Sequence, residues 1–100
     1  APLILADEPT ASLDPRHQIA VMQELKAESR RGALVIAVTH DLTLASRLAD
    51  EIVLMDAGRI VAHGTPAEVL TDERFAAIYG IRVLRHPTEG GAVIAPWDLA

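Results

Sequence analysis

Two polar groups that follow apolar runs carry the residue types needed for metal-dependent hydrolysis. Asp7 and Glu8 follow the apolar run at residues 2–6, and His40 follows the run that begins at Ala33. A carboxylate at a strand end suits Mg²⁺, since one carboxylate with waters and phosphate oxygens completes an octahedral ion. An adjacent Glu can deprotonate an attacking water, and a His from a neighbouring strand can stabilise charge on a phosphate. Taken alone, however, two consecutive acids more often only begin a solvated loop.

The elements that hold these residues predict a parallel α/β arrangement. Residues 2–6 are apolar without alternation, as are residues 33–38 of a second expected strand at 33–39, which indicates strands buried on both faces. Between them, Asp14 as N-cap and Pro15 at the first helical position predict a helix running to about Arg31. In such sheets ligands bind just beyond the carboxyl ends of the strands, where the polar residues lie.

The second half of the chain predicts hairpins and short helices. The expected elements are a helix at 42–49, a hairpin at 51–56 and 59–63, a helix begun by the capping box Thr65-Pro66-Ala67-Glu68, a helix at 72–79 ended by Gly80, and a hairpin at 81–85 and 92–95. We find no internal repeat and no linker, so one α/β region is expected.

Composition excludes several classes of protein. Of 100 residues half are hydrophobic and three aromatic, which predicts an aliphatic core rather than disorder. The net charge is −5 without a basic stripe, so no nucleic-acid partner is expected. The longest apolar run, residues 33–38, is too short to span a membrane, and we expect no signal peptide because no basic-then-apolar segment opens the sequence. Because Ala1 is not Met, we expect the true start to lie elsewhere, unless processing removed it.

Several motifs in order resemble those of the ABC ATPases, a P-loop NTPase family. Residues 3–10 (Leu-Ile-Leu-Ala-Asp-Glu-Pro-Thr) resemble the Walker B motif, and residues 11–14 (Ala-Ser-Leu-Asp) resemble the D-loop. Residues 35–41 (Val-Ile-Ala-Val-Thr-His-Asp) are similar to the H-loop strand. Residues 55–60 and 63–66 match the hairpin and helix start that usually follow. The resemblance covers nearly the whole chain.

The resemblance implies a role for each matching residue. Asp7 would coordinate Mg²⁺, Glu8 would be the general base or water-positioning residue, and His40 would contact the γ-phosphate of ATP. Ser12, Leu13 and Asp14 would cross the interface between two ATPase subunits of a homodimer. The family more often has Ser-Ala before Leu-Asp, so the order of the first two D-loop residues is exchanged here.

The resemblance also implies that residues 1–100 are the C-terminal portion of one ABC ATPase domain. The chain has no P-loop, which needs Gly, four residues and Gly-Lys-Ser/Thr; its only lysine, Lys26, lies in the predicted helix. The family's Leu-Ser-Gly-Gly signature and glutamine loop are missing too, and Gly90-Gly91 do not replace the signature. No cofactor-binding residue is therefore assigned, and the 100-residue piece alone is expected to neither bind ATP tightly nor hydrolyse it.

The tail is similar to that of the importers of iron–siderophore, haem and cobalamin. The matching segments are residues 64–71, 78–81, 86–87 and 94–96. This resemblance implies a subunit that energises uptake of haem or iron–siderophore through a membrane permease, with a binding protein involved indirectly. It would sit on the cytoplasmic face of the membrane. Two alternatives stay open: a soluble ABC ATPase of DNA repair or translation, and a non-enzymatic α/β binding module.

The remaining histidines and the tryptophan have simpler interpretations. His17 is expected at the surface of a helix, His63 to cap a turn, and His86 in solvent. The four histidines lack the spacing of a zinc site. Trp97 is expected to anchor the tail, and the alternative is that it faces a partner. The two apolar strands also lack flanking strands, so the tail hairpin or a partner would have to cover their edges.

Overall fold

The computed structural model describes residues 2–100, so Ala1 lies outside the described part. The chain divides into two compact units, Ala1–His40 and Asp41–Ala100, and each has its own elements. The strands form three separate two-stranded sheets. The predicted tail hairpin forms one of these sheets by itself.

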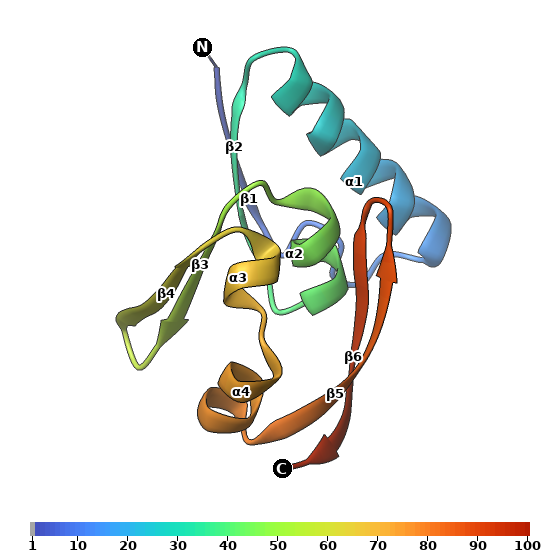
Figure 1. The fold of residues 1–100 in the computed structure, drawn as a ribbon. Coiled ribbons are helices and arrows are strands. Elements are labelled where there is room, and N and C mark those ends of the chain that lie inside the picture. The colour runs from blue at the N-terminus through green and yellow to red at the C-terminus, as the bar shows by residue number, and fades with distance from the viewer. Residues whose placement is uncertain (1) are drawn as a thin grey trace. The chain divides into compact units, whose positions relative to one another are not determined.

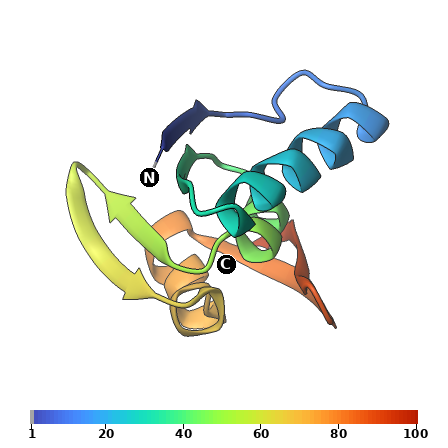
Figure 2. The same cartoon turned by 90° about the horizontal axis from the view of Figure 1, so that it is seen from above.

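The first unit is a strand–helix–strand unit (Figure 1). Strand β1 (Leu3–Asp7) pairs in parallel with β2 (Leu34–Val38), and helix α1 (Pro15–Arg30) connects them. Figure 2 shows the loop that leaves β1 and the helix that returns toward β2. The α/β class and the parallel pairing predicted from the sequence are confirmed.

Helix α1 begins and packs largely as its sequence predicts. The Asp14 side chain accepts a hydrogen bond from the main-chain N–H of His17, and proline occupies the first turn. Met22 and Leu25 are buried. Ile19, which lies three residues before Met22 on the same side of the helix, remains 48% exposed, so this apolar side is buried only in its C-terminal part.

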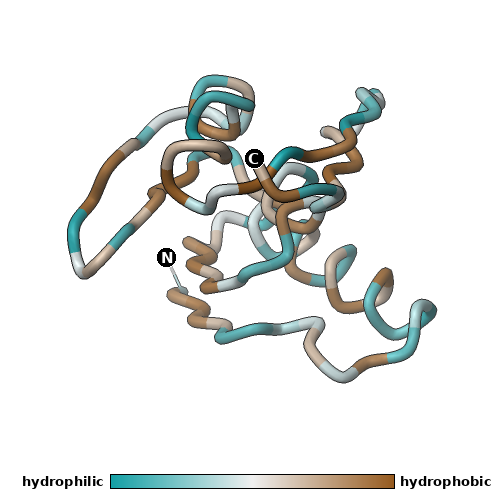
Figure 3. Tube along the Cα trace, turned by 90° about the horizontal axis from the view of Figure 1, so that it is seen from below, coloured by the Kyte–Doolittle hydropathy of each residue, from teal (hydrophilic) through white to brown (hydrophobic). Residues whose placement is uncertain are grey.

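The prediction that both strands are buried on both faces was wrong for this chain. Along each strand exposed residues alternate with half-buried ones. The exposed apolar side chains are Leu3, Leu5, Leu34, Ile36 and Val38. Figure 3 shows the hydrophobic residues running consecutively along these strands. A continuous apolar run thus does not guarantee burial, because burial also requires an element packed on each face.

The second unit contains the hairpins and short helices that the sequence predicts. Its elements are α2 (Leu42–Leu48), β3 (Ile52–Asp56), β4 (Arg59–Gly64), α3 (Pro66–Val69), α4 (Asp72–Arg74), the π-helical turn η1 (Phe75–Tyr79), β5 (Ile81–Thr88) and β6 (Gly91–Leu99). The pairs β3–β4 and β5–β6 are antiparallel. The π-helical turn was not predicted. Within residues 2–100, no helix has the length and apolarity that crossing a membrane requires.

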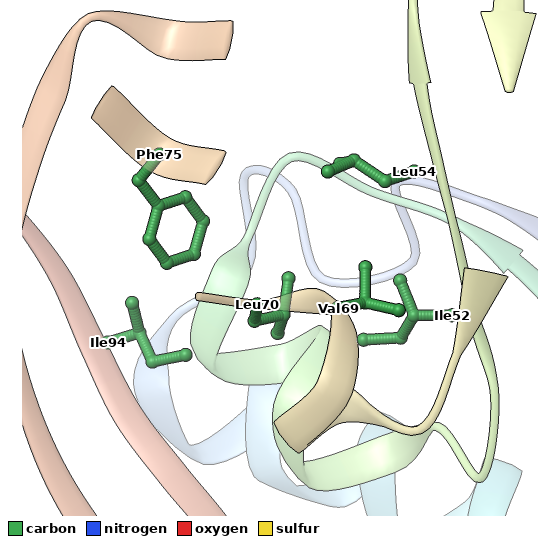
Figure 4. Close-up of a cluster of buried hydrophobic side chains, with 6 residues drawn as sticks. All are labelled: Ile52, Leu54, Val69, Leu70, Phe75 and Ile94. Carbon is green, nitrogen blue, oxygen red and sulfur yellow. The ribbon is translucent and has the colours of Figure 1, made fainter. Parts of the chain in front are cut away.

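Six buried side chains form the core of the second unit (Figure 4). They are Ile52, Leu54, Val69, Leu70, Phe75 and Ile94. Figure 4 shows that they come from β3, from the helical segments and from β6. Phe75 is fully buried, with an exposed fraction of 0%. The core therefore depends on side chains from both hairpins and from the helices between them.

Two hydroxyl groups of helix α2 cover the edge of strand β6. The hydroxyl of Thr43 donates to the main-chain oxygen of Ile94 and accepts from its N–H, at 3.0 and 2.8 Å. The Ser46 hydroxyl accepts from the N–H of Ala92 at 2.9 Å. These bonds satisfy backbone groups that an open strand edge would leave free for another chain. Close approach also requires glycine at position 91, where a Cβ would lie 2.7 Å from the main-chain oxygen of Ser46.

Two predictions for single side chains of the second unit were wrong. Trp97 does not anchor the tail, because 67% of it is exposed. His63 does not act as a turn cap, because its Nε2 atom lies 3.0 Å from Oε2 of Glu51 across the β3–β4 hairpin. His86 is exposed, as predicted.

Two helix-capping carboxylates make the stability of the chain sensitive to acid. Main-chain and side-chain hydrogen bonds from Thr65 lower the pKa of Glu68 below its ordinary 4.5. The pKa of Asp14 is lowered mainly by the main-chain bond from His17. Because folding favours the charged forms, their contribution is full above the unfolded-state pKa values and is lost as pH falls through the folded ones. The free energy of unfolding should therefore decrease as the pH is lowered below about 4.5. Urea titrations followed by circular dichroism at each pH measure it.

The matched control is the double variant Asp14→Asn and Glu68→Gln. Asn and Gln can still accept the capping hydrogen bonds, but they do not titrate. The variant should lose less stability between pH 5 and pH 3 than the wild type. Equal losses would show that these caps do not contribute to the acid sensitivity.

Candidate functional site

The acidic pair and the predicted histidine meet where strands β1 and β2 end. The strands are parallel and in register, with Asp7 opposite Val38. The next residues along each strand, Glu8 on one side and Thr39 and His40 on the other, are therefore neighbours. This is the arrangement expected from the carboxyl ends of parallel strands.

Glu8 is held by the end of β2 through its main chain and its side chain. Its N–H donates to the main-chain oxygen of Val38 at 2.7 Å. Its carboxylate accepts from the N–H of His40 at 3.1 Å and from the hydroxyl of Thr39 at 3.4 Å. The side chain keeps 35% of its surface exposed, so water can still reach it. A carboxylate that is both oriented and open to water is suited to general-base chemistry.

The His40 ring lies beside this carboxylate and points into solvent. Its Nε2 atom is 3.7 Å from Oε1 of Glu8, and 95% of the side chain is exposed. The main chain of His40 is thus fixed by its bond to Glu8, while the ring remains free to contact a molecule beyond the strand ends. The structure brings together the base and the charge-stabilising group predicted from the sequence.

Asp7 is exposed at the last position of β1. Within residues 2–100, no three or more Asp, Glu, His or Cys side chains gather in a way that could hold a metal ion by themselves. A magnesium ion at Asp7 would take its remaining ligands from water and phosphate, which is its usual mode of binding. Asp7 and its neighbour Glu8 provide too few ligands for such an ion by themselves, so the phosphates of a nucleotide would have to provide others.

The predicted D-loop residues follow Glu8 in a tight, partly strained turn. The N–H of Ala11 donates to the main-chain oxygen of Glu8 at 3.0 Å. Ser12 has a φ of 64°, in the left-handed region, and Leu13 is half-buried. Asp14 caps helix α1, and its Oδ1 lies 2.9 Å from the His17 ring nitrogen Nδ1. Asp14 thus has a local structural role, and the inter-subunit role of Ser12, Leu13 and Asp14 stays a prediction.

Sequence reasoning missed Thr39, whose hydroxyl contacts Glu8. The available signal was its position beside His40, since residues that follow parallel strands in register must lie near each other. His17 is exposed, as predicted, and its ring contact with the capping Asp14 was not predicted.

The second unit has a mostly apolar groove of about 410 Å³ that contains none of the predicted site residues. Leu70, Arg85 and Ile94 are among the residues that line it. Arg85 donates to the main-chain oxygen of Leu70 and to the carboxylate of Asp72. The groove therefore lacks the acid–base pair found at the strand ends.

Comparison with known proteins finds relatives that are similar to this chain in sequence. The chain is 43% identical over 95 residues to hemin import ATP-binding protein HmuV of Rhodococcus jostii, covering 93% of this chain and 32% of that protein. HmuV of Pseudomonas aeruginosa is 45% identical over 94 residues, covering 92% and 37%. HmuV of Rhizobium meliloti is 50% identical over 80 residues, covering 80% and 30%. The chain thus spans about a third of the length of these relatives.

A solved structure shares the fold. It is described as a metal-chelate type ABC transporter in an inward-facing conformation, with a TM-score of 0.74 and 24% identity, covering 98% of this chain and 40% of that one. The predicted resemblance to ABC importer ATPases is confirmed. The chain shares its fold with part of that structure, and no protein-family model matches the chain.

Proposed function

We propose that the chain is the C-terminal portion of the ATP-hydrolysing subunit of an ABC importer that takes up haem. The observation that carries this proposal is the pairing of Glu8 with His40, 3.7 Å apart at the ends of two parallel strands. The chain is also 43–50% identical, over 80–95 residues, to hemin import ATP-binding proteins of three bacteria. These relatives favour haem over iron–siderophore and transport over DNA repair or translation.

Three residues of the chain would have different roles in ATP hydrolysis. Glu8 would accept a proton from the attacking water, because its carboxylate is oriented by β2 and open to solvent. His40 would donate to the γ-phosphate and stabilise charge as it develops. Asp7 would hold magnesium through water, and such an ion would supply positive charge to balance that of the phosphates.

The phosphate cradle would come from a part of the subunit that lies outside residues 1–100. No Gly-Lys-Ser/Thr sequence occurs in the chain, so nothing in it replaces the P-loop amides and lysine. We therefore propose that residues 1–100 alone are inactive. Purified residues 1–100 should show no magnesium-dependent ATP hydrolysis above the background of Glu8→Gln. A rate that Glu8→Gln abolishes would contradict this.

The proposed subunit would work in a larger assembly. Ser12, Leu13 and Asp14 would face a second ATPase subunit in a homodimer, and Asp14 would do so while it caps α1. The dimer would bind a haem permease at the cytoplasmic face of the membrane, and a haem-binding protein would deliver cargo on the other side. No nucleic acid would be involved, which agrees with the net charge of −5.

A chimera tests the proposed function. In HmuV of Pseudomonas aeruginosa, the 94 matched residues would be replaced by those of this chain. Growth of a strain that lacks its own HmuV, with hemin as sole iron source, should be restored. A chimera with Glu8→Gln should fail to grow, and one with Glu89→Gln, an exposed acid in the β5–β6 turn, should grow normally.

The outcomes separate the competing functions. Hydrolysis of ATP without growth on hemin would contradict the haem importer and keep the ATPase. A chimera that melts like the native relative but does not hydrolyse ATP would contradict the ATPase and favour a binding module. Sequencing the coding DNA upstream of Ala1 is an independent check, because a P-loop and a Leu-Ser-Gly-Gly segment should be found there.

Replacing His40 by Ala in the intact subunit should reduce ATP hydrolysis by about 100-fold, the usual effect of removing one donor to developing charge. The turnover rate should fall with little change in ATP affinity, measured by steady-state kinetics and by fluorescent-nucleotide binding. His86→Ala is the matched control, since that ring is exposed on β5. An unchanged rate in His40→Ala would remove this residue from the catalytic machinery.

A further inference from the structure

We propose that Thr39 is a positioning residue for Glu8, and that its hydroxyl fixes the orientation of the carboxylate that activates water. This inference rests on the proposed function, because it gives Thr39 a role in the same reaction. The matches to family motifs did not assign Thr39 any role. Its assignment comes from two hydrogen bonds at the end of β2.

The two bonds hold different oxygens of the same carboxylate. The hydroxyl of Thr39 donates to Oε2 of Glu8 at 3.4 Å, and the N–H of His40 donates to Oε1 at 3.1 Å. One donor alone would leave the carboxylate free to rotate about its terminal bond. Two donors on separate oxygens define its plane. Because a carboxylate can accept about four hydrogen bonds, each oxygen keeps room for a water.

The main chain of Glu8 is tied to the same strand end. Glu8 has a φ of 47°, in the left-handed region that residues with a side chain rarely adopt. Its N–H donates to the main-chain oxygen of Val38 at 2.7 Å. Three consecutive residues, Val38 at the end of β2 and the following Thr39 and His40, thus hold both the backbone and the carboxylate of Glu8. A strained backbone held in this way fits a site that must keep one geometry.

A packing role for Thr39 makes a different prediction. Threonine is common in strands because its branched side chain packs well on a pleated surface. Thr39 is half-buried, so its methyl group could be the part that matters. Valine keeps this shape and removes the hydroxyl, whereas serine keeps the hydroxyl and removes the methyl. The two substitutions therefore separate positioning from packing.

The experiment measures kcat and KM for ATP in the intact subunit with Thr39→Val and Thr39→Ser. Thr39→Val should lower kcat roughly tenfold, since a long bond to a charged acceptor is lost, and KM should stay within about twofold. Thr39→Ser should restore most of kcat. Thr88→Val is the matched control, because its hydroxyl bonds only locally to Gly91 in the β5–β6 turn, and it should keep the wild-type kcat.

The double variant Thr39→Val with Glu8→Gln shows whether Thr39 acts through Glu8. If it does, adding Thr39→Val to the Glu8→Gln variant should cause no further decrease in kcat. A wild-type kcat in Thr39→Val, equal losses in Val and Ser variants, or additive losses in the double variant would each overturn the proposal. Absence of hydrolysis by the wild-type subunit itself would instead overturn the proposed function.

Discussion

Replacing Glu8 by Gln in the intact subunit is expected to reduce ATP hydrolysis by roughly 100- to 10,000-fold, the range that a general base supplies. Glutamine has nearly the same shape and can keep the acceptor for the N–H of His40, but it cannot take a proton. Nucleotide binding should therefore remain. The measurements are phosphate release at saturating ATP and equilibrium binding of a fluorescent nucleotide.

Glu89→Gln is the control for this substitution, because it makes the same chemical change at an exposed acid in a turn. It should keep both hydrolysis and binding. Hydrolysis by Glu8→Gln within about threefold of the wild type would show that Glu8 is not the base. Loss of binding together with hydrolysis would point instead to a structural role for the Glu8 turn.

Local signals in the sequence predicted most of the elements correctly. Asp14 caps α1 as expected, and Thr65 and Glu68 form a reciprocal capping box at α3. Ala57 and Gly58 both have positive φ, as a tight hairpin turn requires. In each case the interacting groups lie within a few residues of each other. Such features can be predicted because the neighbouring residues alone determine them.

The predictions that failed depend on residues distant in sequence. Leu5 lies in a fully apolar run, yet 71% of it is exposed, because exposure depends on what packs against the strand. Trp97 is exposed for the same reason, although a large aromatic side chain is usually buried. The π-helical turn at Phe75–Tyr79 follows a normal helix start and has no local signature that separates it from an α-helix.

The candidate site could be predicted only in part, because it combines sequence motifs with contacts between residues distant in sequence. Asp7, Glu8 and His40 were assigned through the resemblance to ABC ATPase motifs, since residue type and spacing alone were weak signals, and their closeness follows from the parallel strands. The bond from Thr39 to Glu8 spans 31 residues and depends on the exact register of β1 and β2. The candidate residues could thus be named from the sequence motifs, whereas the contact from Thr39 could be found only in the structure.

Phe75→Ala is expected to lower the free energy of unfolding of the 100-residue chain by about 3–5 kcal/mol, the usual cost of truncating a buried aromatic side chain. Phe75 is fully buried among the core side chains of the second unit. Its ring also lies 5.8 Å from the Arg85 guanidinium and 6.3 Å from the ring of Tyr79. Because small domains have only about 5–15 kcal/mol of stability, this loss would be large. Urea unfolding followed by circular dichroism measures it.

Trp97→Ala is the matched control, since it removes an even larger aromatic side chain that is 67% exposed. It should change the free energy of unfolding by less than about 0.5 kcal/mol, as surface substitutions usually do. Comparable losses in the two variants would contradict the core described here and would restore Trp97 as the anchor of the tail. A large loss in Phe75→Ala alone would place the stability of the second unit in the packing of its helical turn against the two hairpins. The exposed tryptophan would then remain available to a partner.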